Sequence, residues 1–151
     1  MKTLIAVPCM DQVPALFTNS LASLQKVDEC TLAMQIGSLI YDSRNQLAAK
    51  AIQMNYDYVF WPDSDMVFPT DTLVYMHKVM AENNLDILSG LYFRRRPPYS
   101  PVLFDKFEID DSGCHWTEFE DIPDSLFEIG ACGFGCVLMK TSVLVGTYLD
   151  H

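Results

Sequence analysis

Two aspartates separated by one residue, Asp63 and Asp65, are the side chains whose type and spacing most directly suggest chemistry. They follow Tyr58 to Trp61, a run of aromatic and β-branched residues that predicts a strand buried on both faces and ended by Pro62. In near-extended backbone, residues two apart point the same way, so both carboxylates are expected to face one hard cation. Ligands of open α/β sheets bind at the carboxyl ends of strands, where this pair is predicted to lie. The alternative is an ordinary loop, because Pro, Asp and Ser are common turn residues.

A second candidate site begins the preceding helix, which we expect to run from Ser43 to Met54. Ser43 and Gln46 have the spacing of a capping box, which places Arg44 and Asn45 in the first turn. A helix N-terminus carries a partial positive charge, and a guanidinium adds a bidentate donor for phosphate oxygens. These features outline a diphosphate site. The alternative is a solvated arginine on an exposed helix start.

The elements that must position these residues alternate along the first 93 residues. Strands are expected at 3–7, 32–36, 58–61 and 87–93, and helices are expected to begin at Asp11 (with Pro14 in the first turn), at Ser43, and at Thr70 or Asp71. Such alternation predicts βαβ units, and hence an α/β, Rossmann-like, mostly parallel central sheet with helices on both faces.

The pattern changes after residue 93. A basic loop at 94–98 precedes a short strand at 102–107, an acidic excursion at 108–124, and a glycine-punctuated apolar segment at 128–139. The glycines suit either close backbone approach to a ligand or a weakened core hairpin. We therefore expect one domain, 1–151, with a nucleotide-binding half at 1–93 and a partial acceptor half at 94–151.

Composition narrows the function classes. The net charge of −10 repels a nucleic-acid backbone, so no nucleic-acid partner is expected. The chain contains neither a G-x-G-x-x-G after its first strand nor a P-loop, which disfavours dinucleotide dehydrogenases and P-loop NTPases. Five cysteines without a C-x-x-C pair indicate neither a disulfide framework nor a zinc knuckle, and fit a reducing cytoplasm. No apolar run approaches 18 residues, although peripheral membrane contact stays open.

Five segments together carry a resemblance to a known family: VPCMD, SRNQLAAKA, YVFWPDSDMVFP, LSGLYF and GACGFGCVLMK, in this order. The sequence resembles the nucleotide-sugar glycosyltransferases of the A fold, in the family-two-like branch, over residues 3 to about 145. The resemblance implies a UDP- or GDP-type sugar donor, Mn²⁺ or Mg²⁺ as cofactor, and a saccharide, lipid or protein acceptor. It implies that Asp65 binds the metal and that Asp63 binds the metal or the ribose. It further implies that Pro8 to Asp11 line the base, that Arg44 lies near the ribose and diphosphate, and that Gly130 to Phe134 form the acceptor side.

The end of the chain departs from that family. Its members continue into a segment with an acidic catalytic base, whereas this sequence stops at His151. We therefore expect the C-terminal catalytic segment to be missing, so that donor binding without transfer is possible. The base candidates that remain are Glu118, Glu120, Asp121 and Asp124, whose composition also suits a solvated loop.

Two other functions stay open. A haloacid-dehalogenase-like phosphatase also uses two aspartates in this spacing after a hydrophobic strand, although that strand is normally the first. A non-catalytic or partner-dependent sugar-nucleotide-binding domain is the other alternative. Residues 126–149 are strongly apolar, so we also expect the chain to self-associate through them.

Overall fold

The computed structural model describes residues 1–37, 39–119 and 121–149. The chain forms two compact units. The first comprises Met1–Gly90 and Phe134–His151, and the second comprises Leu91–Gly133. Where the sequence suggests a division between residues 93 and 94, the chain instead leaves the first unit after residue 90 and returns to it at residue 134.

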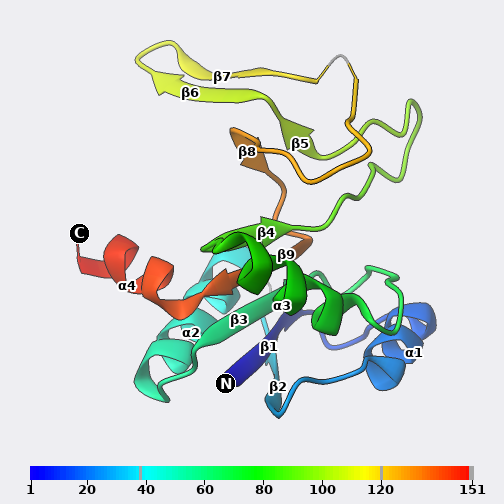
Figure 1. Cartoon of the computed structure of the whole chain (residues 1–151), viewed down its shortest axis with the longest axis vertical. Helices are drawn as coiled ribbons and strands as arrows, with labels where there is room; N and C mark the ends of the chain where they lie inside the picture. Colours follow the sequence, from blue (N-terminus) through cyan, green and yellow to red (C-terminus); the bar gives the residue numbers. More distant parts are fainter. Residues whose placement is uncertain (38, 120, 150–151) are drawn as a thin grey trace. The chain divides into compact units, whose positions relative to one another are not determined.

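The first unit is built on a five-stranded sheet with the order β2-β1-β3-β9-β4 (Figure 1). Its strands are β1 (Lys2–Cys9), β2 (Glu29–Ile36), β3 (Tyr58–Pro62), β4 (Ile87–Ser89) and β9 (Cys136–Lys140). β1 pairs in parallel with β2 and β3, whereas β9 runs antiparallel to both β3 and β4.

The predicted Rossmann-like, mostly parallel sheet of a glycosyltransferase A fold is therefore wrong, because the fold is mixed α/β. Parallel pairing is confined to β1 with its two neighbours, and the other pairings in the described residues are antiparallel. The prediction failed because a buried apolar strand looks the same in sequence whichever way its neighbour runs. β9 lies between β3 and β4 although the whole of the second unit separates it from β4 in sequence.

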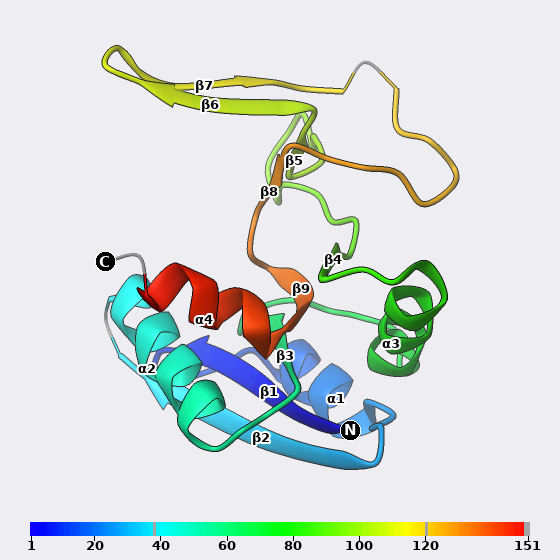
Figure 2. The same cartoon turned by 60° about the vertical axis from the view of Figure 1, so that its left-hand side comes forward.

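Within the described residues, four helices accompany this sheet: α1 (Ala15–Ser23), α2 (Ile40–Gln53), α3 (Thr72–Asn83) and α4 (Thr141–Leu149). Side chains of β3 alternate between the two faces. Tyr58 meets His77 of α3 with ring centroids 4.8 Å apart, while Trp61 faces Arg44 of α2. The helices thus lie on both faces, with α2 and α4 side by side on one of them (Figure 2).

Two helix starts differ from their predictions. The first helix begins at Ala15 after Pro14, so Asp11 is not its cap. α2 begins at Ile40 after Leu39, and Ser43 is buried within it, so the predicted capping box is wrong. Ile40 and Tyr41, which extend the helix before Ser43, are exposed, and α2 begins without a side-chain cap.

The described residues of the second unit contain two small antiparallel sheets. β5 (Leu103–Phe104) pairs with β8 (Ala131–Cys132), and β6 (Lys106–Asp110) pairs with β7 (Gly113–Thr117). The acidic segment 108–124 thus contains most of the β6–β7 hairpin. The strand predicted at 87–93 is shorter, because β4 ends at Ser89 and the chain enters the second unit at Leu91.

None of the helices in the described part of the chain has the length and apolarity needed to cross a membrane. The predicted cytoplasmic location and peripheral membrane contact stay predictions.

Candidate functional site

The acidic pair lies in a tight turn at the carboxyl end of β3. The Met66 N–H donates to the Asp63 carbonyl at 3.1 Å, and the Asp63 N–H donates to the Gly135 carbonyl at 2.9 Å. The near-extended backbone expected between the two aspartates is therefore wrong, because this segment closes a turn directly after the strand. Asp63 is half-buried and Asp65 is exposed.

The side chain of Arg44, on α2, makes hydrogen bonds and aromatic contacts beside this turn. Its Nη2 donates to Asp63 Oδ1 at 2.5 Å and to the Phe134 carbonyl at 3.2 Å. Its guanidinium carbon lies 4.7 Å from the centre of the Phe134 ring and 5.7 Å from that of Trp61. The side chain of Arg44 is 19% exposed and that of Asp63 is 37% exposed, so the ion pair is only partly screened by water. The structure thus joins the two separate candidate sites of the sequence into one.

The ends of the neighbouring strands β1 and β2 lie beside the end of β3. Because β1, β2 and β3 run in parallel, their carboxyl ends lie together. The Gly37 N–H donates to the Cys9 carbonyl at 3.1 Å, which ties the ends of β1 and β2 to one another. Pro8 is buried within β1, whereas Asp11 is exposed just after it and Asn45 is exposed on α2.

A cysteine to which the sequence pattern assigned no role lies close to the acidic pair. Cys136 is paired with Pro62 across β3 and β9. Burial, with a smaller contribution from the negative charge of Asp63, raises the pKa of its thiol to about 11. This thiol therefore stays protonated at neutral pH and contributes no thiolate for a soft metal. The antiparallel pairing that brings it here has no signal in the sequence.

The donor set fits a hard cation held jointly with a ligand. Within residues 1–37, 39–119 and 121–149 there is no cluster of three or more His, Cys, Asp or Glu side chains suited to a metal. Asp63 and Asp65 are carboxylates, the donors that Mg²⁺ and Mn²⁺ prefer, and Mg²⁺ is commonly bound by one or two of them together with substrate phosphates.

The predicted base candidates belong to the second unit. Glu118 lies 4.0 Å from Arg94 in a surface ion pair, and Asp121 and Asp124 are exposed. Glu120 and His151 lie outside the described residues. A catalytic role for the four acidic candidates stays a prediction.

The glycines expected near an acceptor have structural reasons to be small. The Gly130 N–H donates to the Phe104 carbonyl at 2.9 Å, and a Cβ added there would lie 3.0 Å from the Asp105 carbonyl carbon. Gly133 packs against Tyr92 and Val102 in the same unit. Close packing within the second unit, against backbone at Gly130 and against side chains at Gly133, thus accounts for both residues.

Comparisons with known proteins leave the family open. No protein-family model matches the sequence, and no curated protein matches it. Among solved structures, the fold is similar to that of A197 from STIV, with a TM-score of 0.66. The alignment covers 96% of this chain and 68% of that chain at 18% sequence identity. Similarity at that level of identity concerns the fold alone.

Proposed function

We propose that the chain binds a nucleoside-diphosphate sugar through a divalent cation at the end of β3, and transfers the sugar to an acceptor. The observation that carries this proposal is the pairing of Arg44 with Asp63, beside the exposed Asp65. The three side chains place one guanidinium and two carboxylates at the carboxyl end of β3, and the carboxyl ends of strands are where α/β folds bind ligands.

The charges at this edge require a cation if the ligand is a diphosphate. Two like charges at ~4 Å oppose one another by ~4 kcal/mol at an effective dielectric constant near 20, so bare carboxylates repel phosphate oxygens. Mn²⁺ or Mg²⁺ would be held by Asp63 and Asp65, and when bound would neutralise charge on the leaving diphosphate.

Arg44 has a defined part in the proposed binding. Its contacts with Asp63 and the Phe134 carbonyl hold the guanidinium beside the acidic turn. A planar guanidinium fixed in this way is suited to phosphate oxygens, because it loses little side-chain entropy when it binds them.

Titration calorimetry with UDP and with GDP tests the binding step. We expect binding with Mn²⁺ and little with a chelator, and Asp65→Asn should weaken it without changing the melting temperature. Asp71→Asn is the matched control, because Asp71 is also exposed and makes no capping hydrogen bond at the start of α3. Equal affinity with Mn²⁺ and with chelator would refute the bridging cation.

Transfer is tested separately by donor hydrolysis or by sugar transfer to added acceptors. If turnover is found, we expect it to fall on neutralising one of the predicted bases, and Glu118→Gln, Glu120→Gln, Asp121→Asn and Asp124→Asn are the variants to compare. Binding without turnover would favour the non-catalytic or partner-dependent binding domain.

A phosphatase is less well supported by the geometry. Its nucleophile would be Asp63, whose carboxylate accepts a hydrogen bond from Arg44, and this interaction reduces its nucleophilicity. Trapping of a phosphoryl-enzyme after incubation with a phosphomonoester would nevertheless favour the phosphatase over the transferase.

A further inference from the structure

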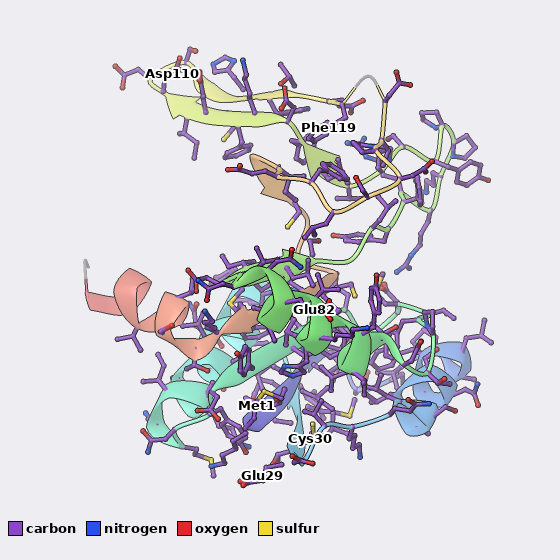
Figure 3. All side chains as sticks on the ribbon, viewed as in Figure 1. Met1, Glu29, Cys30, Glu82, Asp110 and Phe119 are labelled. Carbon is purple, nitrogen blue, oxygen red and sulfur yellow. The ribbon has the colours of Figure 1, made fainter. Side chains whose placement is uncertain are left out.

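β2 forms one border of the five-stranded sheet. It pairs with β1 along its whole length, from Glu29 to Ile36. Among the described residues no strand lies on its other side (Figure 2). Glu29 and Cys30, at its start, lie at the margin of the first unit in Figure 3. A strand in this position presents backbone N–H and C=O groups to a further strand.

The side chains of β2 form an apolar stripe that faces solvent. Leu32, Met34 and Ile36 are 43%, 42% and 64% exposed, whereas Ala33 between them is buried. The three exposed residues are two apart in sequence, so they project from the same face of the sheet. Three large apolar side chains in one row are an unusual use of solvent-exposed surface.

The usual protection of an edge strand is absent from β2. Its residues include neither proline nor lysine, and its register with β1 continues without a bulge. Glu29 is the one charged residue of the strand. Natural edge strands avoid pairing by means of such features, so an unprotected edge indicates a place where pairing occurs.

We propose that β2 pairs with β2 of a second copy of this chain, antiparallel and centred on Ala33, so that two five-stranded sheets become one. In this register Leu32 lies opposite Met34 of the second copy, and Cys30 lies opposite Ile36. All four positions are even-numbered, so the apolar stripes of both copies meet on the same face. The interface is isologous, as expected of a twofold dimer.

Charge opposes the association of two copies least at β2. Two molecules with a net charge of −10 repel one another, and association is least opposed where the surface is nearly neutral. In the proposed register Glu29 lies opposite Gly37 of the second copy, so the strand's one carboxylate meets no other carboxylate. This inference is independent of the proposed sugar-nucleotide site, because it uses different residues.

The oligomeric state of the full chain tests the proposal. Sedimentation and light scattering from about 1 to about 100 μM, the range of weak specific interfaces, should show the mass doubling with concentration. Met34→Lys should raise the dissociation constant by about tenfold or more, because the substitution occurs twice in a symmetric interface. Leu32→Lys should act alike, and matched melting temperatures would show that both variants fold.

Val145→Lys is the matched control, since Val145 is exposed on α4 and lies within the 126–149 segment expected to self-associate. A monomeric wild type over the whole range would overturn the proposal. So would association that Val145→Lys abolishes and Met34→Lys leaves unchanged, because it would assign the interface to the C-terminal segment instead.

A cross-link tests the register. In Ile36→Cys the introduced thiol should lie opposite Cys30 of the second copy, and mild oxidation should give a covalent dimer. Combining Ile36→Cys with Cys30→Ser should remove that product. Absence of the dimer in the first variant, or equal amounts in both, would overturn the antiparallel register.

Discussion

Replacement of Asp63 by asparagine should change nucleotide affinity in opposite directions with and without a divalent cation. The carboxylate of Asp63 is proposed to hold the cation, and it also neutralises the guanidinium of Arg44 at 2.5 Å. An asparagine at this position would keep the shape of the side chain but remove the negative charge. The two roles predict opposite effects on a bound diphosphate.

The magnitude follows from the charges at the turn. A carboxylate ~8 Å from a phosphate charge opposes it by ~2 kcal/mol at an effective dielectric constant near 20. Without metal, Asp63→Asn should therefore strengthen diphosphate binding, by up to about 30-fold. With Mn²⁺, the lost ligand should weaken binding by about tenfold or more. The free energy of unfolding should change by about 1 kcal/mol or less, because Asp63 is more than one-third exposed and its ion pair is screened by solvent.

Calorimetry with UDP and GDP, in Mn²⁺ and in chelator, measures both effects on the same preparation. Asp71→Asn serves again as the control for the loss of one exposed negative charge outside the turn. Weaker binding of the variant under both conditions would refute the reasoning, because it would mean that Asp63 contacts the nucleotide directly. Unchanged binding under both would place the site elsewhere.

Three further predictions concern the site and the stability of the two units. Arg44→Lys should weaken nucleotide binding by about tenfold in calorimetry, since a point charge cannot replace the two parallel donors of the guanidinium. Wild-type affinity in this variant would mean that Arg44 does not contact the nucleotide. Gly130→Ala should destabilise the second unit by about 1–3 kcal/mol in thermal unfolding, because the added Cβ would crowd the Asp105 backbone. Gly113→Ala is the comparison: its Cβ would meet open space, but its φ is 129°, so this variant measures backbone strain without crowding. Burial lowers the pKa of His77 from 6.5 to about 4, so as the pH falls the unfolded chain binds a proton before the folded chain does. The free energy of unfolding that the neutral His77 contributes above pH 6.5 should therefore be lost as the pH falls to about 4. Urea unfolding should show a shallower pH dependence for His77→Gln than for wild type, and identical slopes would assign the acid sensitivity to the carboxylates.

Local sequence determined the elements around the site. The run from Tyr58 to Trp61 predicted a buried strand, and β3 is buried along most of its length. Asn84 ends α3 in the left-handed conformation, with φ 51° and ψ 46°, which asparagine adopts more readily than most residues. These features depend on residue type and spacing within one segment, which a single sequence contains in full.

The tertiary structure decided strand direction and the partners of the acidic turn. β9 enters the sheet antiparallel between β3 and β4, and the residue just before it, Gly135, supplies the carbonyl that binds the Asp63 N–H. Arg44 meets Asp63 across 19 residues of sequence and Phe134 across 90. Apolar strands buried on both faces have the same residue pattern in either direction, so sequence alone could name Asp63, Asp65 and Arg44 but could not decide which neighbours surround them.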